Sequence, residues 1–284
     1  MKLRIVLLLL LGSTQVWAGN QCLNLFDDHQ LLLDRKSLIE QDLSSIYMAE
    51  VAGKTPAEVA DMNLKTLASI QQEVPFKTTS TRAVEITEMA ADKLVDLTYE
   101  NPIVNPGNKK YDPNRNIGFC FGRATFIHLM LLKMGVQKNS IRKIWAIGPM
   151  NTGDINWRYH VATMVYTKKG WLVLDTNHGG PVSPQEWIAT YSKMSTDGKL
   201  RFYSSDASKF AFMMGKYSRL QLGMDINQER DFYRGYFKDM MEWVRKRKLS
   251  EDGIVSVDKD LTEKQSILNM TMSDMWRSVV EFLR

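Results

Sequence analysis

Three short stretches of the sequence hold side chains that could together attack an amide carbonyl. Cys120 stands in "GFCFGRA", His160 in "WRYHVAT" and Asp175 in "LVLDTN". The chain has two cysteines and four histidines, so few combinations of a nucleophile and a base are open to it. Cysteine, histidine and a carboxylate are the groups that many enzymes use for nucleophilic catalysis, with the carboxylate orienting the imidazole.

Cys120 is predicted to begin a helix. The run "CFGRATFIHLMLLKM" (120–134) suits a helix that Gly135 can end, and residues 99–118 before it are rich in Asn, Pro and Gly, which is typical of an irregular loop. Unpaired N–H groups and the positive helix dipole lower the pKa of a thiol at this end. The Cys120 N–H could also bind a developing oxyanion, and Asn116 in the loop is a candidate second donor.

His160 is the favoured base among the histidines. His128 lies eight residues along the same helix, about 12 Å from Cys120 at 1.5 Å per residue. His29 belongs to an N-terminal helical region with no partner pattern around it, and His178 stands beside two glycines in a predicted turn. His160 falls in the middle of a predicted strand, where the backbone can aim its ring.

The turn after that strand decides whether a carboxylate can reach His160. Strands are predicted at 157–167 and 171–176, because both are enriched in β-branched and aromatic residues. A connection of two or four residues sets His160 opposite Asn177 and places His160 and Asp175 on one face as diagonal neighbours. An odd connection without a bulge would separate them, and Asn177 would then be the alternative orienting residue.

Each of these residues also has a purely structural interpretation. Cys22 and Cys120 could form a disulfide in an oxidising compartment. His160 could be an ordinary hydrogen-bonded histidine of a sheet, and Asp175 a residue that ends a strand. The neighbours Trp157 and Tyr159 are predicted to share a face with Val161, as core or cleft wall.

The elements that must position these residues form an α+β pattern. Residues 19–100 are predicted to be a helical N-terminal region, with a capping box at Thr55–Glu58 and a further helix at Ala83–Leu97. Residues 101–200 hold the cysteine helix and an antiparallel meander. Residues 201–284 are predicted to be helical, most clearly at Asp225–Arg245 and Thr262–Phe282.

The first 18 residues have the pattern of a secretory signal peptide. Lys2 and Arg4 precede an apolar run from Ile5 to Leu11, and small residues follow up to Ala18. That run is too short to span a bilayer, so we expect an exported chain, periplasmic or secreted, without a membrane span. Removing Lys2 and Arg4 from the 37 basic residues leaves 35 against 32 acidic ones. A net charge of +3 argues against a nucleic-acid partner.

The same motifs, taken with their flanking residues, resemble the secreted bacterial protein-glutaminase family. The likeness covers roughly residues 115–190 and rests on five matches in order. They are Cys120-Phe121-Gly122-Arg123-Ala124, Trp157-Arg158-Tyr159-His160-Val161-Ala162, Leu174-Asp175, Gly180-Pro181-Val182 and Trp187. The resemblance implies a papain-like or transglutaminase-like core, in which the cysteine helix packs on an antiparallel sheet carrying the histidine and the aspartate.

The resemblance implies deamidation of glutamine side chains in proteins or peptides, through a Cys120, His160, Asp175 triad and a thioester. An amine in place of water would make the same site a transglutaminase, and a backbone amide would make it a protease. No cluster of residues has metal-ligand spacing, and the chemistry requires no cofactor. By the same likeness, residues 19–100 are a removable pro-segment or a permanent part of the enzyme. The alternative from another class is a non-catalytic exported binding module with a Cys22–Cys120 disulfide. The sequence leaves the oligomeric state open.

Overall fold

The computed structural model of the chain describes residues 42–77, 82–112, 118–153, 155–209, 212 and 231–247. The predicted signal peptide, Cys22, His29, Asn116 and the predicted helix Thr262–Phe282 lie outside these residues. Within the described ranges, no helix combines the length and the apolar character needed to cross a bilayer.

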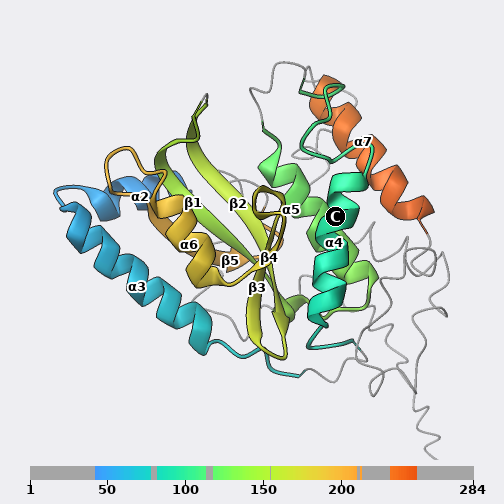
Figure 1. The fold of residues 1–284 in the computed structure, drawn as a ribbon, viewed down its shortest axis with the longest axis horizontal. Helices are drawn as coiled ribbons and strands as arrows, with labels where there is room; N and C mark the ends of the chain where they lie inside the picture. Colours follow the sequence, from blue (N-terminus) through green and yellow to red (C-terminus); the bar gives the residue numbers. More distant parts are fainter. Residues whose placement is uncertain are drawn as a thin grey trace, which may run out of the picture.

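A five-stranded antiparallel sheet forms the centre of the protein, with the strand order β4-β3-β2-β1-β5 (Figure 1). The strands are β1 (Ile141–Asn151), β2 (Asn156–Thr167), β3 (Gly170–Asp175), β4 (Gly180–Val182) and β5 (Arg201–Asp206). The first four follow one another as a meander, and the fifth returns to the far edge beside β1. Sheet and helices together confirm the predicted α+β fold.

The sheet continues beyond residue 200, so the prediction of a helical region from residue 201 onward is wrong for Arg201–Asp206. Residues Arg201–Asp206 form β5 and pair with β1 from Arg142 to Ile147. The segment "RFYSSD" is only six residues long, and its short pattern of aromatic residues precedes a stretch that reads as helical. The one C-terminal helix within the described residues is α7 (Asp231–Lys246), which matches the later part of the predicted helix Asp225–Arg245.

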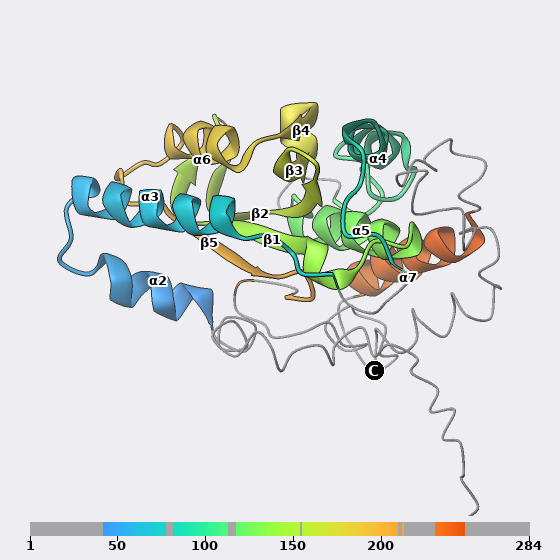
Figure 2. The ribbon, with the colours of Figure 1, turned by 90° about the horizontal axis from the view of Figure 1, so that it is seen from below.

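Helices cover both faces of the sheet, and two clusters of buried residues show which helix belongs to which face. One cluster joins the sheet to α3 (Pro56–Gln72) and α6 (Pro184–Ser192). The other joins the opposite face to α2 (Leu43–Val51) and α5 (Cys120–Lys133), and extends to α4 (Glu88–Glu100) and α7. Figure 2 shows α5 between α4 on one side and α7 on the other.

Two of the predicted helix starts are confirmed and one is wrong. Thr55 and Glu58 form the expected capping box with Pro56 in the first turn of α3. The helix predicted from Ala83 begins instead at Glu88, because Thr87 caps it and Ala83 pairs with Val136 in an isolated bridge. α5 runs from Cys120 to Lys133 as predicted to within one residue, and Gly135 follows with a φ of 84°.

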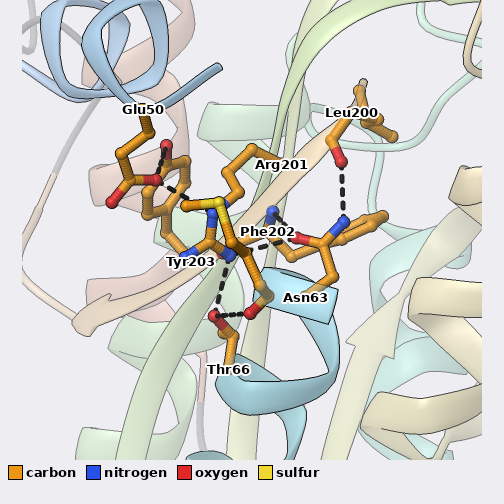
Figure 3. A network of polar contacts seen from close by, with 8 residues as sticks. Glu50, Asn63, Thr66, Leu200, Arg201, Phe202 and Tyr203 are labelled. Carbon is orange, nitrogen blue, oxygen red and sulfur yellow. Dashed lines mark hydrogen bonds and ion pairs between the residues drawn. The ribbon is translucent and has the colours of Figure 1, made fainter. Parts of the chain in front are cut away.

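A buried polar network ties the N-terminal helices to β5 (Figure 3). Arg201 lies at its centre, where its Nε donates to Glu50 of α2 at 2.9 Å. Its Nη1 donates to Asn63 and Thr66 of α3 at 3.0 and 2.8 Å. Asn63 also donates to the Leu200 carbonyl at 2.8 Å and accepts from the Phe202 N–H at 3.1 Å. The edge strand is therefore held by side chains from the N-terminal region.

Candidate active site

The site lies where β2 extends past the end of β3. The pairing of these two strands runs from Thr167 to Thr163 and ends there. At this point α5 packs beside β2, and Thr163 Oγ1 donates to the Ala124 carbonyl at 2.7 Å. Burial raises the pKa of the Cys120 thiol, and the backbone of Val161 is among the groups that lower it. The first turn of α5 therefore lies beside the stretch of β2 that carries His160.

The register of β2 and β3 is the one that the even connection predicts. Thr167 lies opposite Gly170 and Thr163 opposite Leu174, so two residues make the turn. This parity places His160 and Asp175 on the same face, and His160 Nε2 lies 2.8 Å from Asp175 Oδ2. Both side chains are buried, at 1% and 3% exposure.

Asp175 Oδ2 accepts two further hydrogen bonds, both from α6. The Trp187 Nε1–H donates to it at 2.7 Å and the Tyr191 hydroxyl at 2.9 Å. Burial alone would raise the pKa of Asp175, but the charge and hydrogen bond of His160, followed by the hydrogen bonds from the Asn177 backbone and from Trp187, hold it well below its ordinary value. The carboxylate therefore stays ionised beside the imidazole.

Asn177 supports this carboxylate and does not take its place. Its backbone N–H donates to Asp175 Oδ1 at 3.0 Å, and its Nδ2 donates to the Tyr191 hydroxyl at 3.0 Å. Between the two predicted orienting residues, the structure places Asp175 against His160.

The surroundings of His160 favour its protonated form. Burial lowers its pKa, but the charge and hydrogen bond of Asp175, followed by the interaction with Cys120, raise the pKa to about 9. Its other nitrogen, Nδ1, is also buried and does not contact Asp175. Because Nε2 is committed to Asp175, Nδ1 is the nitrogen that can exchange a proton with Cys120 or a substrate.

Cys120 is the first residue of α5, and it is a half-buried residue with a free thiol. Burial by itself raises the pKa of this thiol, but the hydrogen bond and charge of His160 and the charge of Arg123 outweigh that effect and lower it. Arg123 is buried and donates from Nη1 to the Gly118 carbonyl at 2.5 Å. A thiolate and an imidazolium therefore stabilise each other here.

A sharp backbone turn delivers Cys120 to the site. Gly118 and Phe119 have φ angles of 71° and 45°, and Phe119 is the one non-glycine residue with a positive φ within the described ranges. This conformation costs a residue with a Cβ roughly 1–2 kcal/mol. No side chain caps the helix at Phe119, which leaves the first N–H groups of α5 available to a developing oxyanion. The candidate second donor, Asn116, lies outside the described residues.

The ring of His160 stacks on two aromatic side chains, one from α6 and one from β2 itself. Its centroid lies 4.6 Å from the Tyr191 ring and 5.2 Å from the Trp157 ring. The prediction that Trp157 shares a face with Tyr159 is wrong, because Trp157 packs against the cluster on the α3 and α6 face and Tyr159 against the opposite cluster. The β1 partner strand carries a register shift between Ile147 and Met150, and such a bulge bends and twists the ladder at this point.

The sequence did contain a signal for the two residues of α6. Trp187 and Tyr191 are four residues apart on a helix that Ser183 caps, so they lie on one face shortly after the strand of Asp175. Of the other described histidines, His178 lies close to the site, with its ring centroid 5.8 Å from that of Tyr191. His128 is buried on α5, with its pKa lowered to about 3 by burial and then by the charge of Lys143. His178 ends a short 3-10 helix, η3 (Thr176–His178).

The comparisons with known proteins concern the same segment. Residues 109–191 match the model of the family described as glutaminase, and this range contains Cys120, His160 and Asp175. The resemblance to the protein-glutaminase family is therefore confirmed over this segment. No curated protein matches the chain.

Solved structures similar to the chain include three of protein-glutaminases. The A47Q2 mutant of pro-protein-glutaminase is 16% identical with a TM-score of 0.37, over 55% of this chain and 61% of that one. Pro-protein-glutaminase is 14% identical with a TM-score of 0.38, over 70% and 72%. The protein-glutaminase of Chryseobacterium proteolyticum is 18% identical with a TM-score of 0.33, over 44% and 75%. The chain thus spans about six-tenths of the first of these proteins.

Proposed function

We propose that this protein, whose residues 109–191 match the glutaminase family, is a cysteine amidohydrolase that deamidates glutamine side chains of proteins or peptides. The observation that carries the proposal is the buried hydrogen bond of 2.8 Å between His160 Nε2 and Asp175 Oδ2, beside a thiol that begins a helix. This arrangement supplies a nucleophile, a base that later acts as an acid, and an orienting carboxylate.

The reaction begins with the thiolate of Cys120 attacking the carboxamide carbon. The carbonyl oxygen becomes an oxyanion that the Cys120 N–H can bind. His160 gives its Nδ1 proton to the departing nitrogen, so ammonia leaves and a thioester remains on Cys120. His160 is then neutral and can accept a proton.

Water completes the cycle. Neutral His160 takes a proton from a water molecule, whose oxygen attacks the thioester carbonyl. The bond to sulfur breaks, glutamate is released and the thiolate re-forms next to the protonated imidazole. Asp175 holds the ring in one orientation through both halves of the reaction, because its own carboxylate is fixed by donors from α6 and from the Asn177 backbone. Among the described residues no group of three His, Cys, Asp or Glu side chains could hold a metal ion, and no step above uses one.

We also propose that the protein works outside the cytoplasm, in the periplasm or the medium. The support is the pattern of Lys2 and Arg4, the apolar run Ile5–Leu11 and the small residues up to Ala18. The expected partners are therefore exported or extracellular proteins that display glutamine.

The test is ammonia release from a glutamine-containing peptide, with mass spectrometry of the product. Deamidation gives ammonia and a glutamate peptide of unchanged length. A protease would give shorter fragments, and a transglutaminase would release ammonia but incorporate an added primary amine. Cys120→Ala should abolish the reaction, and Cys22→Ala is the matched control that should retain it. Full activity in Cys120→Ala would refute the proposal, and so would an intact wild-type chain that leaves every glutamine peptide unchanged.

A further inference from the structure

The backbone directly before Cys120 packs against α7, a helix outside the segment that matches the glutaminase family. The match to the glutaminase family ends at residue 191, whereas α7 begins at Asp231. Its Tyr236 is 2% exposed and stacks on Phe119, with ring centroids 4.2 Å apart and planes inclined by 26°. Phe119 is the residue with the left-handed backbone directly before Cys120.

The contact between Tyr236 and α5 is close enough to restrict the sequence of α5. A Cβ added at Gly122 would lie 2.5 Å from the Tyr236 hydroxyl oxygen and from a ring carbon, nearer than real side chains approach. Glycine at position 122 therefore lets the Tyr236 ring lie directly on the backbone of the first turn of α5. This is the turn whose N–H groups face the proposed oxyanion.

Tyr236 is itself fixed by neighbours on several sides. Its ring meets Tyr111 edge to face at 5.4 Å and Phe237 at 5.0 Å. α7 is fastened at two further points, where the Tyr111 hydroxyl donates to Asp239 and Lys133 of α5 donates to the Val244 carbonyl. A ring held this firmly can keep Phe119 in a conformation that its own backbone disfavours.

We propose that Tyr236 is a positioning residue, which holds Phe119 in its left-handed conformation and so aims the thiol and N–H of Cys120. The aromatic ring performs this role. The Tyr236 hydroxyl is buried and has no hydrogen-bond partner among the described residues, so replacing it with hydrogen should cost the protein nothing. This inference rests on the proposed role of Cys120 as the nucleophile, and it assigns a function to the C-terminal helix.

The experiment compares Tyr236→Met with Tyr236→Phe in the full-length protein. Methionine fills the buried space without a planar ring, whereas phenylalanine retains the ring. The rate of Cys120 alkylation by iodoacetamide is measured from pH 5 to 10 in a Cys22→Ala background, together with kcat and KM for ammonia release. Met240→Ala is the control, because Met240 is buried one helical turn after Tyr236 on α7 and has no aromatic ring that could stack on Phe119.

We expect Tyr236→Met to lower kcat by at least about tenfold, since a small displacement of a reacting group has effects of this size. Its alkylation profile should move to higher pH, because the thiol loses its alignment with His160 and the helix N-terminus. Tyr236→Phe should restore both the rate and the profile. Met240→Ala should lose stability with an unchanged profile.

Two results would overturn the inference. One is a folded Tyr236→Met variant whose alkylation profile overlaps that of the parent, and the other is a Tyr236→Phe variant as impaired as Tyr236→Met. If Tyr236→Met does not fold, Phe119→Leu replaces it, because it removes the same stack from the other side and should give the same shift. Alkylation reports on the thiol directly. If Tyr236→Met shows the expected shift of the alkylation profile but no variant and no parent protein releases ammonia, the proposed deamidation is contradicted and the positioning role is supported.

Discussion

Replacing Asp175 with asparagine removes a charge and changes few contacts. If the amide oxygen takes the place of Oδ2, it still accepts from His160, Trp187 and Tyr191. The amide nitrogen then faces the Asn177 N–H, which donates to Oδ1 at 3.0 Å in the native protein. One buried donor loses its acceptor, which costs about 1–3 kcal/mol of stability. The variant should therefore fold, and the effect on His160 can be measured.

The charge of Asp175 is the largest contribution that raises the pKa of His160 to about 9. Without it, burial takes the pKa to the ordinary value of about 6.5 or below. At pH 7.5 the protonated fraction of His160 should fall from roughly 0.97 to roughly 0.1 or less, by the titration relation with these two pKa values. A change of this kind corresponds to about 3 kcal/mol of electrostatic stabilisation lost by the imidazolium, at 1.36 kcal/mol per pKa unit.

The thiolate of Cys120 should be lost together with the imidazolium, because each lowers the free energy of the other. We expect alkylation of Asp175→Asn by iodoacetamide at pH 7.5 to be at least about tenfold slower, and the rise of its rate with pH to move to higher pH. Ammonia release should fall further, since general acid catalysis contributes about 10²- to 10⁴-fold. Asp61→Asn, at an exposed position of α3, is the control. An Asp175→Asn variant with a native circular dichroism spectrum and an unchanged profile would refute this account of the site.

Two further predictions concern other buried groups. Trp187→Phe and Trp171→Phe make the same substitution at buried positions, but Trp187 donates to the Asp175 carboxylate whereas Trp171 donates to the Glu73 backbone carbonyl at 2.8 Å. Both variants should be less stable to urea. Only Trp187→Phe should move the basic limb of the pH dependence of ammonia release to higher pH, because a carboxylate with fewer donors binds the His160 proton more strongly. Equal pH profiles for the two variants would contradict this. His128 has its pKa lowered to about 3, so the unfolded chain binds a proton more readily and stability should fall from about pH 6.5 downward, by at most about 1.4 kcal/mol per pH unit. His128→Leu should flatten that slope in urea titrations at pH 7 and 4.5, and an unchanged slope would assign the acid sensitivity to other groups.

Local patterns were sufficient to predict the elements that carry the triad. The start of α5 at Cys120 followed from a breaker-rich loop before an apolar run, and the even turn between β2 and β3 fixed which face Asp175 shares with His160. Both depend on neighbours within about 20 residues. Because side chains alternate between the two faces of a strand, the length of the turn alone predicts which residues of two paired strands share a face.

The supports of the site could not be predicted in this way, because they come from distant parts of the chain. Tyr191 is ordinary in its own sequence context and gains its role from the packing of α6 against the end of β3. Tyr236 reaches Phe119 across more than 100 residues. The face of Trp157 depends on a bulge in the neighbouring strand β1, which the sequence of β2 does not contain.

Contacts of the N-terminal helices with the sheet favour a permanent part of the fold over a removable pro-segment. The buried Asn63 of α3 binds the Leu200 carbonyl and the Phe202 N–H, and Trp171 of β3 donates to Glu73 just beyond α3. Removing α2 and α3 would leave these groups without partners, at about 1–3 kcal/mol each, and would expose the face of the sheet that α3 covers.

We therefore expect these helices to be a permanent part of the fold. A protease site engineered between residues 77 and 82 tests this expectation. After cleavage the two fragments should elute together on gel filtration, and ammonia release should not rise. Separation of the N-terminal fragment accompanied by higher activity would instead identify it as a removable pro-segment.

Arg201→Met provides an independent check, because it breaks the hydrogen bonds to Glu50, Asn63 and Thr66. It should destabilise the protein by roughly 3 kcal/mol, whereas Lys169→Met, which breaks an exposed ion pair with Glu88, should change stability by less than about 1 kcal/mol.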